Sequence, residues 1–576
     1  MRWLVVILIL DVVLAVWLIG GAGHSERADL VFVSGSEHRF LDPQRITWSL
    51  DIRVANCLFE PLVQIKLPEM TPEPGAAQRW TVSADERTYT FHLREDAVWS
   101  SGDPVTADDF IFAWHRALMP DFAADYTQLL WCIRGAKDFF HFRQQQLVAY
   151  SKLTEPSREQ AQESITRAEA HFTETVGLHA PDSRTLVVEL ERPTHYFLSL
   201  CAFATFMPVH KASVESQISV DSDTGRMIQD PYWTRPDRII CNGPFVLARR
   251  RFKRDLLLTQ NPLYWNRDAV GVTSILELIV SEPQTALLMY DAGQVDWLPD
   301  LPAANTLAAD LLAQDRGDVN LGPAAGTYFY NFNCSPALPD GRPNPLADAR
   351  VRRALSMAID RKTIVERVTR LNQPLARSFV PHGSIPGYDA PVDAGIVYDP
   401  AAARKLLAQT GHANGKGLDG LSILYNTGAS HEKIAQQIKR NWEQELGIGV
   451  TLEGQEVAVF GDRLRNTDFS ICRAGWYGDY VDPTTFLDKF RKDNGNNDAS
   501  YADNEFEELM RRADNESDST KRMALLREAE VIILRDQPIA PIFQYVRLQV
   551  FDPERVRNMH MNPWGYRRLD LVEVVK

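Results

Sequence analysis

Strand-like and helix-like patterns alternate along both halves of this 576-residue chain, and this alternation constrains its fold more than any other feature. Residues 88–93 alternate apolar and polar side chains with a period of two, as a half-buried strand does. After Asp348 the apolar positions from Val351 to Ile359 follow helical spacing. We find no internal repeat and no long disordered tract. The sequence therefore predicts α/β lobes rather than a repeat fold, with room for two or three domains.

Several shorter patterns predict individual elements. Thr106 is expected to cap a helix that runs to Leu118, because acidic residues follow it in the first turn. Residues 242–247 and 255–259 are predicted to pair as two strands, with the basic run 249–254 as a solvated hairpin tip. We also expect a strand at 30–33, a helix at 51–59, one or two exposed helices within 137–175, a strand at 185–189 and an aromatic strand at 327–333.

The N-terminus has the character of a targeting segment. A short basic start is followed by an apolar run at 4–20, interrupted by Asp11, and then by the small residues 20–23. This order is typical of a secretory signal peptide, and the run is also close to the shortest membrane span. Residues 1–27 are therefore predicted to be a signal peptide or an uncleaved N-terminal membrane anchor. In both cases we expect a periplasmic protein, tethered to the inner membrane in the second.

Composition argues against several classes of function. The net charge is −14, whereas phosphate binding needs a basic surface, so nucleic acid is not expected as a partner. The six cysteines have no CxxC spacing, which argues against a zinc or iron–sulfur site. In an exported chain their even number allows disulfides, and buried free thiols are an equally open alternative. We expect no metal and no cofactor.

The common enzyme signatures are also missing. The sequence has no GxSxG, HExxH or Walker A motif, and no GxGxxG that precedes a helix. Paired carboxylates such as Asp479 and Asp482 could hydrolyse a glycoside in principle, but 76 acidic residues produce such pairs by chance. The pair Asp108-Asp109 is explained by the helix start. We expect no enzyme, with an exported hydrolase as the alternative.

The segment from Arg473 to Pro483, RAGWYGDYVDP, combines the parts of a peptide-binding site. Gly475 lets another backbone approach closely, Trp476 offers an apolar wall, and Asp479 could place a negative charge beside both. An extended peptide with a free ammonium group needs these parts. Asp482, which precedes a proline, is expected to shape the turn.

This segment resembles the RAGWxxDYxxP signature of the oligopeptide-binding proteins that serve ABC importers, within family 5 of the bacterial extracellular solute-binding proteins. Similar segments follow one another in the family's order and cover most of the chain from Asp29 onward. The resemblance implies an α/β fold like that of the periplasmic binding proteins of type II, the two-lobed Venus-flytrap, with an extra inserted domain. The similar segments include LFEPL at 58–62, WSSGDPVTADDF at 99–110, NGPF at 242–245, NPLYW at 261–265 and VRRALSMAIDR at 351–361.

The resemblance also implies where the lobes divide. Residues 28–59, 190–325 and 546–576 would form a discontinuous lobe I. Residues 60–189 would form an inserted domain II, and residues 326–545 a lobe III that carries the ammonium-binding loop. The ligand would lie between lobes I and III and be enclosed as they close.

Roles for individual residues follow from the positions that match the family. Asp479 matches the carboxylate that pairs with the peptide's ammonium group. Gly475, Trp476 and Tyr477 match the segment whose backbone pairs with the peptide like an added strand. Thr47, Trp48 and Ser49 match the opposite strand-like contact, which comes from lobe I. Arg473 and His431 match positions that help to receive the ligand's terminal carboxylate. Tyr126 matches an aromatic residue at the rim of the cleft.

Three positions depart from the family pattern. A cystine often joins the aromatic strand to the signature loop, but here the two positions are Gly326 and Tyr477. The acidic residue often found on the aromatic strand is Asn331, and the tryptophan expected after 455–456 is Val457. The last two changes alter the side-chain pockets, so the family's peptide length and side-chain preference do not transfer to this chain.

The resemblance implies a solute-binding protein that captures short peptides between its lobes and delivers them to an ABC transporter. Its partners would be the peptides and the permease and ATPase complex of the inner membrane, and it would act as a monomer. Relatives bind nickel chelates, haem or sugars, so a non-peptide solute is the alternative within the class, although Asp479 favours a ligand with an ammonium group. A membrane-tethered sensor or chaperone that has lost transport is a third possibility.

Overall fold

Three sheets of four or five strands organise the part of the chain that the computed structural model describes, residues 27–301, 306–428 and 430–575. The predicted targeting segment lies outside these residues, apart from Arg27. Within the described ranges, the helices are too short or too polar to span a bilayer.

The first sheet contains the N-terminal strand and the predicted basic hairpin. Its N-terminal strand pairs in parallel with one neighbour, and the other pairings are antiparallel. The hairpin tip exposes Phe252, and Arg249, Arg251 and Arg254 all pair with Asp255, which confirms the predicted hairpin. The strands, in spatial order, are β1 (Leu30–Ser34), β12 (Ser274–Ile279), β11 (Asp255–Gln260) and β10 (Phe245–Arg251), and helix α2 (Ser49–Leu58) packs against β10.

The second sheet is antiparallel and carries the expected period of two, since every second residue of its strand at 88–93 is buried. Thr106 begins the following helix with a reciprocal capping box to Asp109, as predicted. The strands, in spatial order, are β4 (Ala77–Val82), β5 (Thr88–Leu93), β7 (Thr185–Glu189) and β6 (Leu178–Asp182), and the helices are α3 (Ala107–Leu118), α4 (Ala136–Tyr150) and α5 (Arg158–Thr175).

The third sheet holds the aromatic strand between the central strand and an edge strand, and helices pack around the sheet. Asp348 caps the helix predicted to follow it, because its side chain accepts a hydrogen bond from the Arg350 backbone. The strands, in spatial order, are β15 (Thr451–Gln455), β14 (Ser422–Asn426), β16 (Ile471–Tyr477), β13 (Val319–Phe332) and β17 (Ile539–Val550). The helices are α10 (Ala349–Met357), α12 (Pro400–Gln409), α13 (His431–Leu446), α16 (Asn504–Asp514) and α17 (Ser519–Asp536).

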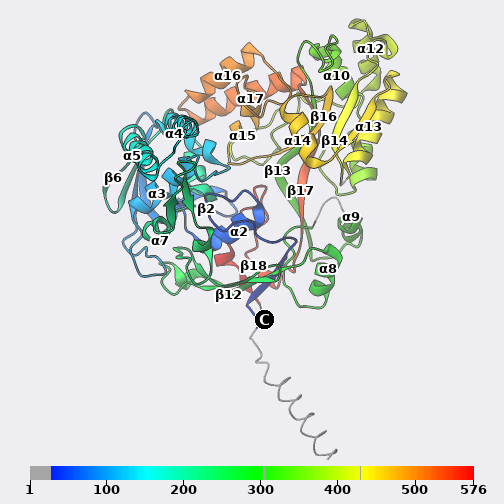
Figure 1. The fold of residues 1–576 in the computed structure, drawn as a ribbon. Coiled ribbons are helices and arrows are strands. Elements are labelled where there is room, and N and C mark those ends of the chain that lie inside the picture. The colour runs from blue at the N-terminus through cyan, green and yellow to red at the C-terminus, as the bar shows by residue number, and fades with distance from the viewer. Residues whose placement is uncertain (1–26, 302–305, 429, 576) are drawn as a thin grey trace, which may run out of the picture.

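Strands β13 and β17 connect the first and third sheets. Their antiparallel pairing runs from Val319 opposite Val550 to Asn331 opposite Ile539, with a shift in register between Pro323 and Thr327. Figure 1 shows both strands at the centre of the molecule, with α10, α12 and α13 on one side and α3, α4 and α5 on the other. The result is the two-lobed α/β arrangement that the sequence predicted.

Shorter elements complete the structure. Six cysteines lie among the described residues, and none of them forms a disulfide, so the structure favours free thiols, four of them buried. The short elements are β2 (Val63–Lys66), β3 (Thr71–Pro74), α6 (Phe197–Cys201), α7 (Lys211–Glu215), β8 (Ile218–Val220), β9 (Met227–Gln229), α8 (Pro283–Asp291), α9 (Thr306–Ala313), α11 (Arg361–Thr363), α14 (Val457–Arg465), α15 (Thr484–Leu487), β18 (Val556–Arg557) and β19 (Glu573–Val574).

Candidate functional site

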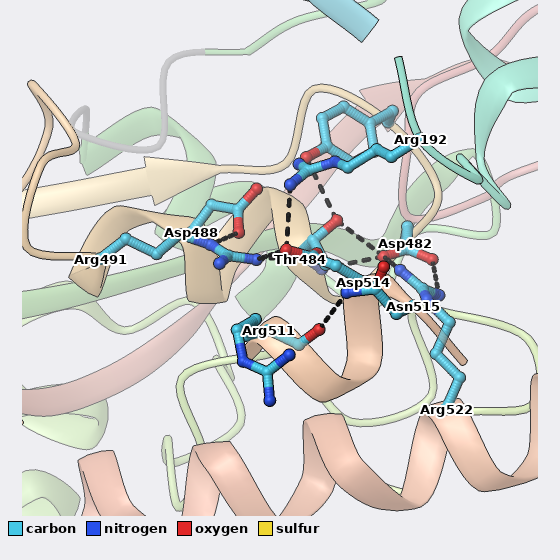
Figure 2. Close-up of polar contacts among 10 residues, drawn as sticks. Arg192, Asp482, Thr484, Asp488, Arg491, Arg511, Asp514, Asn515 and Arg522 are labelled. Carbon is cyan, nitrogen blue, oxygen red and sulfur yellow. Dashed lines mark hydrogen bonds and ion pairs between the residues drawn. The ribbon is translucent and has the colours of Figure 1, made fainter. Parts of the chain in front are cut away.

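The loop at residues 478–483 follows β16 and is fixed at its far end by a buried ion pair. Two nitrogens of Arg522 lie 2.6 and 2.9 Å from the two carboxylate oxygens of Asp482, and both side chains are almost fully buried. Asp482 also accepts hydrogen bonds from the backbone and the hydroxyl group of Thr484, at 3.0 and 2.7 Å (Figure 2). Such a bidentate contact fixes geometry as well as charge. The prediction that Asp482 shapes the turn is confirmed.

Asp479 also lies on this loop, and its carboxylate has few hydrogen-bond partners among the described residues. Its backbone N–H donates to the hydroxyl oxygen of Thr485 at 2.9 Å, and the Tyr126 hydroxyl approaches its Oδ1 at 3.5 Å, the outer limit of a hydrogen bond. Within the described part of the chain, no cation forms an ion pair with Asp479. Burial raises the pKa of Asp479 to about 6, partly opposed by the Tyr126 contact. A positive charge brought beside it would stabilise the ionised form.

Asp479 faces a cavity of about 190 Å³ between segments that are far apart in the sequence. Five of the ten predicted site residues line this cavity: Thr47, Ser49, Tyr126, Tyr477 and Asp479. The cavity is smaller than the roughly 300–1,000 Å³ of pockets that enclose a drug-sized ligand, so in this conformation it has room for one end of a peptide.

The predicted contact at residues 47–49 differs from a strand. Trp48 has an extended backbone, but Ser49 is the first residue of α2, so it cannot continue a strand-like contact. The helix starts two residues before the expected 51–59, because Trp48 takes the N-cap position. The Trp48 side chain is half exposed and does not line the cavity.

Aromatic rings form one wall that leads from the cavity towards Arg473. The ring of Tyr477 stacks on Tyr545 at 4.5 Å, and Tyr545 meets the ring of Tyr328 edge-on at 6.2 Å. Tyr328 in turn stacks with His431, which begins α13, at 5.7 Å. The guanidinium group of Arg473 lies 4.9 Å from the centre of the Tyr328 ring.

Arg473 and His431 differ in charge. Arg473 contacts the neutral groups of Asn426 and Tyr545 at 3.2 and 3.4 Å, and its Nε is buried without a hydrogen-bond partner among the described residues. Burial and the nearby Arg473 lower the pKa of His431 to about 4, so its imidazole is neutral at neutral pH. Of this pair, Arg473 alone supplies a positive charge to a carboxylate.

Gly475 and Trp476 have different surroundings from those the sequence suggested. A Cβ atom on Gly475 would lie 2.3 Å from the Tyr545 hydroxyl, so this position excludes a side chain. The indole of Trp476 packs against a buried hydrophobic cluster and does not line the cavity, and its N–H donates to the Thr485 backbone oxygen at 2.7 Å. Gly326 pairs with Tyr477, whose ring occupies the space of the missing cystine.

Three arginines that line the cavity were not predicted from the sequence. We call Arg53, Arg547 and Arg567 the arginine cluster; all three line the cavity, together with Asp300. They come from α2, from β17 and from the C-terminal segment, so only the folded chain brings them together. No local motif marks them.

The fold and this interlobe cavity define a solute-binding protein of the two-lobed type II class. The family described as "Bacterial extracellular solute-binding proteins, family 5 Middle" matches residues 71–498. The chain belongs to this family.

Two relatives match most of the chain. The oligopeptide-binding protein OppA of Bacillus subtilis (strain 168) is 33% identical over 507 residues, which cover 86% of this chain and 83% of the relative. The periplasmic murein peptide-binding protein MppA of Escherichia coli (strain K12) is 31% identical over 542 residues, covering 92% and 90%.

Solved structures agree with this assignment over almost the whole length. The unliganded open form of the periplasmic murein tripeptide-binding protein MppA is similar with a TM-score of 0.76 at 29% identity, covering 96% of this chain and 98% of that one. Haemophilus influenzae OppA in complex with the peptide RPPGFSPFR gives a TM-score of 0.71 at 29% identity, covering 96% and 100%.

Proposed function

We propose that this protein captures short peptides between its two lobes and delivers them to an ABC importer in the inner membrane. It would bind its ligand without chemical change and act as a monomer. The relatives named for oligopeptides and murein peptides, and the peptide complex of the Haemophilus influenzae protein, support a peptide as the solute.

The observation that carries the proposal is the difference between the two carboxylates of the cavity. Asp300 is paired with Arg53 at 2.6 Å and is half exposed. Asp479 has a raised pKa and, among the described residues, no cationic partner. Because an enclosed ammonium group is tolerated only beside an anion, Asp479 suits the N-terminus of a peptide.

The remaining site residues fit a ligand held mainly by its backbone. Residues 475–477 form the end of a strand to which a peptide can add. Main-chain pairing gives affinity that depends little on the peptide's sequence. Arg473 is available for the terminal carboxylate of a peptide that runs along the aromatic wall.

The predicted division into lobes remains part of this proposal. The first sheet draws its strands from 28–59 and 190–325, and the second from 60–189. The boundary at 325 falls within the shift in register of β13 against β17. Export to the periplasm fits the family, and tethering by residues 1–27 remains a prediction about residues outside the described ranges.

Titration calorimetry with trialanine and its N-acetylated form tests the proposal. We expect the native protein to bind the free peptide and to bind the acetylated form far more weakly. Asp479→Asn should weaken binding of the free peptide by about 3–5 kcal/mol, or roughly two to three and a half orders of magnitude, because the enclosed ammonium group loses its anion. The variant should discriminate little between the two peptides.

The matched control is Asp268→Asn, which removes a carboxylate that is 94% exposed and does not line the cavity. It should leave both affinities unchanged. Equal affinity of the native protein for the free and acetylated peptides would remove Asp479 from the site, and binding of neither peptide would refute the peptide proposal.

A further inference from the structure

The arginine cluster carries more positive charge than its surroundings neutralise. Arg53 forms an ion pair with Asp300, at 2.6 Å, yet its Nη1 is buried without a hydrogen-bond partner among the described residues. Arg567 is 7% exposed and donates to the backbone oxygens of His560 and Tyr566, at 3.0 and 2.8 Å, which are neutral acceptors. Three guanidinium groups therefore share one carboxylate.

Arg547 is the member of the cluster with the fewest contacts. Its side chain makes no hydrogen bond and no ion pair with any residue that the structure describes, and its Nε is buried. The guanidinium group instead packs over Gly565, where a Cβ atom would come within 2.9 Å of its Cζ. Its five N–H groups remain free to bind something that the chain itself does not provide.

The positive charges act on one another. Burial lowers the pKa of Arg567 to about 9, and the neighbouring Arg547 and Arg53 add to the effect. The guanidinium is still protonated at neutral pH, so the cluster holds three like charges around Asp300. An anion placed among them would reduce this repulsion, and the planar fork of arginine matches a carboxylate with two parallel hydrogen bonds.

We propose that Arg547, supported by Arg53 and Arg567, binds a second charged group of the ligand, a carboxylate that lies close to its ammonium group. This inference rests on the proposed function. Both Asp479 and Arg547 line the same small cavity, so the two ligand groups would lie close together. The carboxylate would be an acidic side chain near the N-terminus of a longer peptide, or the terminal carboxylate of a dipeptide.

This subsite is distinct from the predicted terminal-carboxylate site at Arg473. Arg473 lies at the other end of the aromatic wall, against Tyr328, and does not line the cavity. A peptide of several residues could therefore place its terminus at Arg473 and an acidic side chain at Arg547. The protein would favour acidic peptides over neutral ones of the same length.

Calorimetry with two matched pairs tests the inference and separates the two sources of the carboxylate. The first pair is Ala-Glu-Ala and Ala-Gln-Ala, and the second is Ala-Ala and its C-terminal amide. We expect the native protein to prefer the charged member of at least one pair by tenfold or more. In Arg547→Met, which keeps an apolar stem but removes the charge, the preference should fall below twofold.

Three comparisons make the result decisive. Ala-Gln-Ala should bind Arg547→Met as it binds the native protein, which shows that the variant is folded and its ammonium site intact. Arg547→Lys should keep part of the preference, because it keeps the charge and loses the fork. Arg254→Gln controls for net charge, because the Arg254 side chain at the hairpin tip is 69% exposed. It should leave the affinity for all four peptides unchanged.

The inference is overturned if the native protein binds Ala-Gln-Ala and the dipeptide amide as tightly as their charged partners. It is also overturned if the preference survives in Arg547→Met. In either case peptide binding itself, and with it the proposed function, would stand. Failure of all four peptides to bind would instead refute the proposed function.

Discussion

At the scale of single residues, the site depends on how charges are paired. Asp482 is buried deeper than Asp479 and has its own arginine, so it is a structural anion. Asp479, three residues earlier, has a hydroxyl group at 3.5 Å and no cation within the described residues. Two carboxylates on one short loop thus have different roles, because only one of them is neutralised by the protein.

The raised pKa of Asp479 predicts a pH-dependent affinity. In the unliganded protein the carboxyl group is protonated below a pH of about 6, and an ammonium ligand needs the carboxylate. Affinity should therefore rise as pH increases from 5 to 7, by about tenfold per unit below 6, and level off above it. Binding near pH 6 should release protons, which calorimetry in buffers of different ionisation enthalpy measures.

Other groups do not account for the same profile. The α-amino group of a peptide titrates near 8 and stays protonated over this range. The pKa of His431 is about 4, so its imidazole stays neutral from pH 5 to 7. Asp479→Asn should bind weakly with a flat profile. A native affinity that stays constant between pH 5 and 7 would contradict the assignment.

At the scale of elements, the loop at 478–483 depends on its anchor to α17. Replacing Asp482 by alanine would leave Arg522 charged and buried, since both side chains are only 3% exposed. We expect the free energy of unfolding to fall by about 3–5 kcal/mol, the usual effect of removing one partner from a buried pair. Calorimetric melting of the unliganded protein measures this as a lower melting temperature.

The control is an ion pair at the surface. Asp462 pairs with Arg465 on α14, and their side chains are 71% and 67% exposed. Asp462→Ala should change the free energy of unfolding by less than about 1 kcal/mol. Equal melting temperatures of the Asp482→Ala variant and the native protein would show that the loop does not need its anchor.

Elements were more predictable from the sequence than the site. The capped helix after Thr106, the strand at 88–93 and the basic hairpin were predicted because propensity, capping and periodicity are local properties of the chain. Asp479 could be proposed from the sequence because it lies within one continuous motif. The arginine cluster was missed because Arg53 lies hundreds of residues before Arg547 and Arg567 in the sequence, and the three share no motif.

At the scale of the whole molecule, contacts across the lobes lie next to the ligand site. The ring of Tyr196 stacks on Tyr480 at 4.2 Å, one residue after Asp479. Arg192 reaches Asp514 at 2.9 Å, and Asp514 is held in place by Arg491 (Figure 2). These contacts join the segment before α6 to the part of the chain that carries Asp479.

Ligand binding should make the protein more compact and more stable. A peptide that bridges the lobes favours the closed arrangement, and a ligand at 100 times its dissociation constant adds about 2.7 kcal/mol by mass action. Small-angle scattering should show a smaller radius of gyration, and calorimetry a higher melting temperature, when peptide is present. Asp479→Asn at the same peptide concentration is the control and should show neither change.

The position of Tyr480 has a consequence for how long a captured peptide stays bound. Tyr480, which stacks on Tyr196, follows Asp479 directly, so a ligand bound at Asp479 as proposed would couple to this ring stack. If the loop must move to release the peptide, the ring stack and the Arg192 contact would have to separate as well. The ring stack would then lengthen the residence time of every bound peptide, acidic or neutral, by the same factor.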